Sequence, residues 1–354
     1  MDMDDLKSSQ LGMIFTSSFL GAGFVSGQEI MQFFGVFGKM GVVGMFLAIA
    51  LFAAFGFIFM YLAKREKTTA IDRIIMGEGS RGVGAFFNGM SLLFLFGVTV
   101  IMLAGAGSLF NQLLGIPYFV GSAILTVLLA LLSLKGIKGI LVVSQAVVPI
   151  LLVMVVIIAI WSYGGLEPAQ VPDSQMQSDN PLLSNWLLST LSFFSYNILA
   201  SLAVLAPVAQ QTRSMKTIVK GTIQGSIQLL MMFACILLSM QRYFGLIGEA
   251  VFPMQALAEK LSPMLGLAYT LLLLAAMFSG ALSCMYGAIV QLFGDKENKK
   301  SVVLMLWAAA FVFSMAGFKE LISVIFPVCG YAYLGAMPLV LVRFFKVYGK
   351  ANNA

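Results

Sequence analysis

The chain has 354 residues, a formal net charge of +6 and no histidine; 60% of its residues are hydrophobic and only 10% are charged. Soluble domains carry roughly 25% charged residues, so a water-soluble fold could not cover this much apolar surface. The composition excludes an ordinary soluble domain, and the spread of basic residues between apolar runs argues against a nucleic-acid partner.

Apolar runs of at least 17 residues recur along the whole chain, and each is long enough to cross ~30 Å of hydrocarbon. The sequence therefore predicts an all-α integral protein of the plasma membrane, in contact with the lipid bilayer. The first run is far longer than the core of a signal peptide, so we expect it to stay in the mature protein. The ten predicted spans cover residues 10–35, 41–63, 84–113, 118–134, 140–162, 185–210, 217–240, 264–293, 301–317 and 320–346.

Basic residues indicate the orientation of these spans. If the N-terminus is cytoplasmic, 17 of the 21 lysines and arginines lie on the inner side, which is the positive-inside pattern. Because the number of spans is even, the C-terminus is then cytoplasmic as well.

The ten spans resemble one five-helix unit used twice. Their lengths are 26, 23, 30, 17 and 23 residues, then 26, 24, 30, 17 and 27, with an amphipathic piece after the second span of each half, at 70–76 and 254–261. An odd number of spans inverts the second unit, and inverted repeats rock about a site at the midplane. The predicted units are 1–162 and 185–354, joined by an extracellular linker at 163–184. The alternative is that tolerance in the boundaries produced the match.

Two polar interruptions lie halfway along spans one and six, at equivalent places in the two units. Residues 21–29 read Gly-Ala-Gly-Phe-Val-Ser-Gly-Gln-Glu, and residues 194–198 read Phe-Ser-Tyr-Asn-Ile. Discontinuous helices at such positions are the best sequence indication of a transport site, so we expect helices 1 and 6 to be broken. A half-helix beginning near Val25 would hold a carboxylate, and span six, through freed carbonyls, Tyr196 or Asn197, would hold an ammonium group. Close helix packing is the alternative for the glycines.

Glu29 is the only acidic residue clearly inside a predicted span. A charged, unpaired carboxylate at that depth costs at least ~2.5 kcal/mol, so it needs a proton, a cation or a hydrogen-bonded pocket. Glu29 is therefore a candidate for proton coupling or gating. The alternative is a structural carboxyl that is bonded to neighbours such as Gln28 or Gln32, or that faces the outer vestibule.

Span eight offers hydroxyl groups for a cation. Ser279 and Ser283 lie on one helical face, because residues four apart are neighbours on a helix. Together with free carbonyls of span one they would form a sodium site. The alternative is that the serines bond back to carbonyls of their own helix.

The sequence lacks the features of two other classes of membrane protein, ATP-driven pumps and intramembrane enzymes. No Walker-type phosphate-binding loop is present, which argues against an ATP-driven pump. An intramembrane enzyme would need acid/base groups, and the chain has neither histidine nor paired carboxylates within a span. We therefore expect no enzymatic activity.

The run from Gly21 to Glu29 resembles the span-one signature of the YkvI-type family of amino acid permeases, in the amino acid, polyamine and organocation superfamily. The Gly-Ala-Gly is shared across that superfamily, whereas the Ser-Gly-Gln-Glu run is typical of the family. The resemblance implies the leucine-transporter fold over nearly the whole chain, with substrate at the broken parts of spans one and six. Position by position, it implicates Ala22, Gly23, Phe24, Ser26, Ser195, Tyr196 and Asn197 in substrate binding.

The same resemblance implies where a coupling ion would bind. Sodium-coupled members use span-one carbonyls and an Ala-x-x-[ST]-[ST] face on span eight, which here reads Gly280-x-x-Ser283-Cys284. A thiol is a poor sodium ligand, so a neighbouring serine substitutes, or coupling is to protons, or there is no coupling ion. The candidate coupling residues are Phe19, Ala22, Glu29, Ser279, Gly280 and Ser283.

The sequence thus predicts a secondary active transporter for a small solute, an amino acid or related amine, with Na⁺ or H⁺ as candidate coupling ion and no other cofactor. The alternative is a ligand-sensing membrane subunit of the same fold, like the germinant-receptor permease homologues, with little or no flux. The sequence leaves the oligomeric state open.

Overall fold

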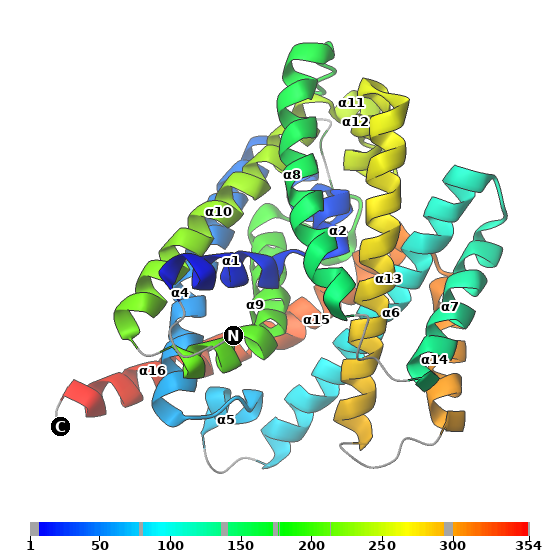
Figure 1. Ribbon diagram of the computed structural model, residues 1–354. Coiled ribbons are helices and arrows are strands. Elements are labelled where there is room, and N and C mark those ends of the chain that lie inside the picture. Colours follow the sequence, from blue (N-terminus) through cyan, green and yellow to red (C-terminus); the bar gives the residue numbers. More distant parts are fainter. Residues whose placement is uncertain are drawn as a thin grey trace.

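The computed structural model is built from helices (Figure 1). It describes residues 7–77, 81–135, 141–172, 176, 178–212, 214–293 and 300–352, and no strand occurs in these ranges. The α-helices are α1 (Ser8–Phe19), α2 (Ala22–Ser26), α3 (Gln28–Phe33), α4 (Gly38–Glu66), α5 (Ile71–Met76), α6 (Arg81–Leu114), α7 (Tyr118–Lys135), α8 (Leu141–Gly165), α9 (Trp186–Gln211), α10 (Met215–Arg242), α11 (Phe244–Ile247), α12 (Pro253–Leu261), α13 (Pro263–Phe293), α14 (Lys300–Ser314), α15 (Phe318–Leu334) and α16 (Ala336–Asn352). Two short 3-10 helices are η1 (Gly35–Phe37) and η3 (Pro181–Leu183).

The predicted spans coincide with these helices. The first nine agree with the observed ends to within about three residues, and the two amphipathic pieces are α5 and α12. Within the described residues, six helical stretches are long and apolar enough to cross a membrane, and three further apolar helices are shorter. The prediction of an all-helical membrane protein is confirmed.

The first span is discontinuous, as expected, and the structure breaks it at two places. After α1 the chain is extended at Leu20 and Gly21, and α2 then makes only five residues before Gly27 adopts a left-handed conformation with φ 86°. Glycine reaches that region without the steric cost that a side chain imposes. The half-helix begins at Ala22 rather than near Val25, and a helix this short carries little of the macrodipole invoked for it.

The prediction that span six is discontinuous is wrong, because α9 is helical without interruption from Trp186 to Gln211. The segment contains no glycine, and its serines have donor groups that can bond within the helix, so nothing forces the backbone to unwind. The ribbon does bend along α9 (Figure 1). Pro207 accounts for a bend, since proline cannot donate the backbone hydrogen bond to the residue four positions before it.

The tenth predicted span is divided by a turn at Gly335 into α15 and α16. Pro338 lies three residues after the turn and cannot donate a hydrogen bond to the carbonyl of Leu334, so the helix cannot continue regularly through this point. α16 then packs against α4 and α5.

The core is formed where the elements of the two halves meet. α1 packs on α10, α4 on α9, and α6 on α13, while α15 contacts both α6 and α9. Aromatic side chains fill the contact between α4, α9 and α10, among them Phe52, Phe193 and Phe233. The broken first helix therefore lies against α9, α10 and α13, which position the candidate site.

Candidate functional site

Glu29 lies where the broken first helix meets α9. It is 5% exposed and is the only buried acidic or basic residue among those whose burial the structure describes. Its Oε1 accepts hydrogen bonds from the Tyr196 hydroxyl and, at 3.4 Å, from the Asn197 side-chain amide. Neither donor is positively charged, so these bonds hold the carboxyl group without neutralising it.

Gly23 makes room for this carboxyl group. A Cβ atom built on Gly23 would lie 2.7 Å from Glu29 Oε2 and no closer than 3.7 Å to any other atom outside its own helix backbone. The glycine in α2 and the acid in α3 are therefore in direct contact across the turn at Gly27. The structure thus brings together Gly23, Glu29, Tyr196 and Asn197, which the sequence assigned to two separate spans.

Aromatic rings surround the Tyr196 end of this site. The Tyr196 ring stacks on Phe326 of α15, with centroids 4.8 Å apart and an angle of 18° between the planes. Phe33 and Phe94 lie 5.8 and 6.0 Å from the same ring. The packing fixes the ring, so the hydroxyl that it carries is directed at Glu29.

Three other predicted substrate residues face elsewhere. Phe24 packs edge-on against Phe233 of α10, and the Ser26 hydroxyl donates to the Gly23 carbonyl at 2.8 Å. Ser195 Oγ lies 2.5 Å from the Gly330 carbonyl of α15. These side chains therefore pack against, or hydrogen-bond to, their own or neighbouring helices and do not face Glu29. Ala22 is buried, with 8% of its surface exposed.

The candidate coupling residues of span eight are on α13. Ser279 Oγ donates to the Ala276 carbonyl of its own helix at 3.1 Å, the arrangement given above as the alternative to a sodium site. Gly280 faces the Met102 side chain of α6, and Ser283 is partly exposed. In the first span, Phe19 packs against Phe52 of α4, with ring centroids 4.4 Å apart and an angle of 39° between the planes.

Two buried polar side chains add to the predicted set. The Tyr269 hydroxyl on α13 donates to the Val25 carbonyl and ties the short α2 to α13. Gln28 is 1% exposed, and neither atom of its amide has a partner among the described residues. A buried tyrosine in an apolar run needs a hydrogen-bond partner. The sequence could therefore have indicated that the Tyr269 hydroxyl is bonded, but not that the acceptor is the Val25 carbonyl.

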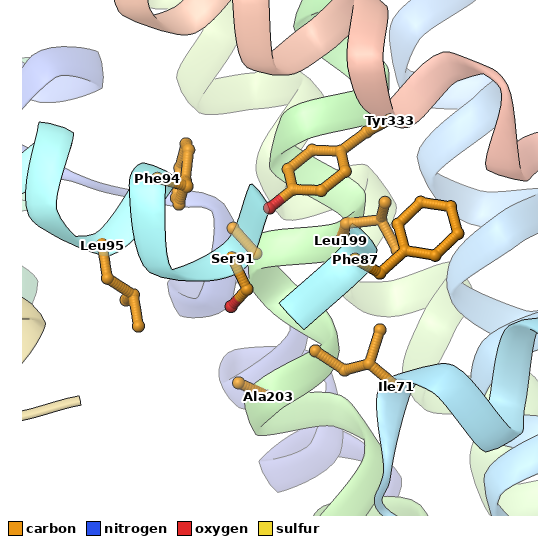
Figure 2. Close-up of a pocket in the computed structure, with 9 residues that line it drawn as sticks. Ile71, Phe87, Ser91, Phe94, Leu95, Leu199, Ala203 and Tyr333 are labelled. Carbon is orange, nitrogen blue, oxygen red and sulfur yellow. The ribbon is translucent and has the colours of Figure 1, made fainter. Parts of the chain in front are cut away.

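An apolar pocket lies beside this site (Figure 2). It has a volume of about 100 Å³ and is lined from α5, α6, α9 and α15, with Ser91 and Tyr333 as its hydroxyl-bearing residues. Phe94 lines the pocket and also packs near Tyr196. The ring of Phe94 is therefore shared by the pocket lining and the aromatic surroundings of Tyr196.

Comparisons with known proteins agree with this architecture. No protein-family profile matches the chain. The uncharacterized membrane protein YkvI of Bacillus subtilis is 29% identical over 341 residues, which are 95% of this chain and 97% of YkvI. The uncharacterized protein YyaD of the same organism is 24% identical over 344 residues, 96% of each chain. The chain is a homologue of YkvI, which confirms the resemblance noted in its first span.

Solved structures identify the fold. A manganese transporter of Eremococcus coleocola, in complex with an aromatic bis-isothiourea substituted compound, superposes with a TM-score of 0.59 at 17% identity, over 96% of this chain and 78% of the transporter. The inward-facing conformation of Mhp1 gives 0.57 at 16% identity, over 86% and 69% of the two chains. The protein is thus a multi-pass helical membrane protein with the leucine-transporter fold. These neighbours are transporters, in agreement with the expectation of a protein that is not an enzyme.

Proposed function

We propose that this protein is a secondary active transporter that moves a small organic solute, an amino acid or related amine, by alternating access. The observation that carries the proposal is a single buried carboxyl group, Glu29, at the contact between a twice-broken first helix and α9. Buried ionisable residues inside membrane helices mark substrate and ion pathways. Broken helices at the contact of two halves are where transporters of this architecture bind their substrates.

The helix contacts support ten spans in two inverted five-span units. If the units exchange places, the contact of α4 with α9 becomes that of α10 with α1, and the contact of α6 with α15 becomes that of α13 with α8. The contact of α5 with α6 likewise becomes that of α12 with α13. All of these contacts occur, as a pseudo-two-fold axis requires. We propose units at 1–162 and 185–354, a linker at 163–184 on the outer side, and both termini in the cytoplasm.

Glu29 supports an amine as the solute. Its donors are neutral, so a charged carboxylate in this buried position lacks compensation unless a proton or a cation joins it. An ammonium group supplies that charge, and the unpartnered amide of Gln28 supplies further donors and an acceptor nearby in the chain. A transition metal, the substrate named for the manganese transporters, is less suited: no group of three His, Cys, Asp or Glu occurs among the described residues.

Protons are favoured over sodium as the coupling ion, through Glu29. The Ser279 hydroxyl already bonds to its own helix, and Gly280 faces the Met102 thioether, which is a soft group that sodium does not prefer. Glu29 can exchange a proton for the ammonium group of the solute, because both neutralise the same carboxylate. Sodium at Ser279 and Ser283, with carbonyls near Phe19 and Ala22, is the competing proposal.

Uptake by proteoliposomes tests the proposal. Labelled amino acids and amines would be offered with and without a sodium gradient, and with and without an outward proton gradient, which drives uptake when a proton leaves in exchange for the solute. We expect concentrative uptake of an amine-bearing solute that the proton gradient increases, and loss of that increase in Glu29→Gln. Saturable binding without flux would instead identify the ligand-sensing subunit. Transport by Glu29→Gln with unchanged proton dependence would refute the role of Glu29.

A further inference from the structure

A polar pocket lies apart from the Glu29 site, where α4, α5 and α16 meet. It has a volume of about 300 Å³. Its lining residues are Glu66, Lys67, Thr68, Arg73, Gly77 and Arg343. Three of these are cations and one is an acid, so the described lining carries a net charge of +2 (three minus one). Such a pocket attracts an anion.

Arg343 is the fixed part of this pocket. It forms an ion pair with Glu66, and its side chain is only 18% exposed. Gly77 has φ 79°, and a Cβ atom there would lie 1.8 Å from an Arg343 guanidinium nitrogen, so the guanidinium rests directly on the glycine backbone. The Arg343 Nε is buried and has no acceptor among the described residues. One ion pair leaves the guanidinium with donors for a second oxygen-bearing group.

Lys67 and Arg73 complete the cationic wall. Both are exposed, so an anion can reach them from outside the bundle. Thr68 contributes a hydroxyl group whose oxygen accepts from the Ala70 N–H at 3.2 Å, which leaves its proton free to donate. A guanidinium, an ammonium and a hydroxyl around one cavity suit the oxygens of a phosphate group.

The pocket lies at the depth of lipid headgroups. α4 has 29 residues, about 43 Å at the helical rise, so it exceeds the ~30 Å hydrocarbon core and ends in the headgroup region. The neighbouring α16 exposes Val342 and Phe345, at 54% and 67%. Acyl chains can cover such side chains while the headgroup occupies the pocket. Basic pockets between membrane helices bind anionic headgroups.

We propose that the pocket formed by Lys67, Thr68, Arg73 and Arg343 binds the phosphate group of an anionic phospholipid. This site is independent of the transport site and of the solute that it takes. Bound lipid would hold α16 against α4 and α5.

Thermal stability of the purified full-length protein, titrated with phosphatidylglycerol in mixed micelles, tests the site. A ligand that binds only the folded protein raises its melting temperature. We expect stabilisation by phosphatidylglycerol, and a weakening of apparent affinity by about fivefold for each cation removed in Arg73→Gln and Lys67→Gln. Phosphatidylcholine, which has no net charge, should stabilise the protein much less.

A matched control separates the pocket from general surface charge. Lys346 is exposed on α16 but does not line the pocket, so Lys346→Gln should keep the wild-type affinity. Equal weakening by Lys346→Gln and Arg73→Gln, or equal stabilisation by the two lipids, would overturn the site. Inorganic phosphate forms a separate arm. Stabilisation by phosphate that Arg73→Gln weakens would support the anion chemistry but assign the site to a soluble phosphate, whereas no effect of either anion would reject it.

Discussion

Replacing Gly23 by alanine tests whether the carboxyl group of Glu29 must keep its observed position. The added Cβ would lie 2.7 Å from Glu29 Oε2, and ordinary contact begins at 3.4 Å, so the carboxyl group must retreat by 0.7 Å (3.4 minus 2.7). The other near neighbours of the added Cβ atom lie at 3.7 Å and beyond, so they do not hinder the new methyl group. The substitution therefore acts almost entirely on Glu29.

The cost follows from the hydrogen bonds that this displacement disturbs. Loss of the bond from Tyr196 costs ~1–3 kcal/mol, depending on the charge of Glu29. Alanine recovers ~1 kcal/mol of helix propensity relative to glycine, so the net loss of stability is only about 0–2 kcal/mol. Helix propensity is the same in the free and bound protein, so it does not offset a loss of affinity. If the solute or proton needs Glu29 in place, apparent affinity should fall by up to about 100-fold, since 1.4 kcal/mol is a factor of ten.

Gly21→Ala is the matched control, because nothing lies within 4 Å of a Cβ at Gly21 and its φ of −95° suits alanine. Both variants would be purified and compared by thermal denaturation and by uptake in proteoliposomes. Glu29→Asp in the Gly23→Ala background should restore part of the lost activity, because the shorter side chain withdraws from the methyl group. Identical uptake by Gly23→Ala and Gly21→Ala would refute the constraint on Glu29.

Three further outcomes are expected. Tyr196→Phe keeps the stacking on Phe326 but removes a donor to Glu29, so it should lower stability by ~1–3 kcal/mol in chemical denaturation. It should also raise solute affinity, because the hydroxyl no longer competes with the solute for the carboxylate; a wild-type result in both would exclude this bond. In Glu29→Gln, the solute binding that remains should be independent of pH between about 5 and 8. A retained pH dependence would point to another proton site. Gly221→Ala would bring a Cβ within 2.3 Å of Leu11, so it should destabilise the α1–α10 contact by ~1–3 kcal/mol in thermal denaturation. Gly89→Ala is the control, because nothing lies within 4 Å of its Cβ, and it should be neutral or slightly stabilising in the same measurement.

The positions of the membrane helices could be predicted because a bilayer requires long apolar runs, and few other patterns satisfy that requirement. The break in the first span was also predictable, since Gly21, Gly23 and Gly27 weaken the helix within less than two turns. The turn at Gly335 was missed, although Pro338 carries a local signal for it. An apolar run does not reveal where a helix changes direction.

The side chains that meet at the site were harder to predict from the sequence. Glu29 was recognised because an acid inside a span is costly, but its partners Tyr196 and Asn197 lie more than 160 positions away. Ser195, which directly precedes Tyr196, faces α15 instead, because successive residues of a helix point about 100° apart. Only the packing of α9 between the first helix and α15 decides which of these three side chains meets the acid.

The contrast between the broken first span and the continuous α9 indicates where motion can occur. α2 is held between the extended residues at Gly21 and the left-handed Gly27, so it can shift without breaking hydrogen bonds inside a long helix. The contacts that restrain it include the bond from Tyr269 to Val25, the contact of Gly23 with Glu29 and the packing of Phe24 on Phe233. A ligand shifts a conformational equilibrium only by its difference in affinity for the two states. A solute that competes with Tyr196 for the Glu29 carboxylate has that difference, because it breaks a hydrogen bond between α3 and α9. A solute that leaves the carboxylate untouched would leave that bond unchanged.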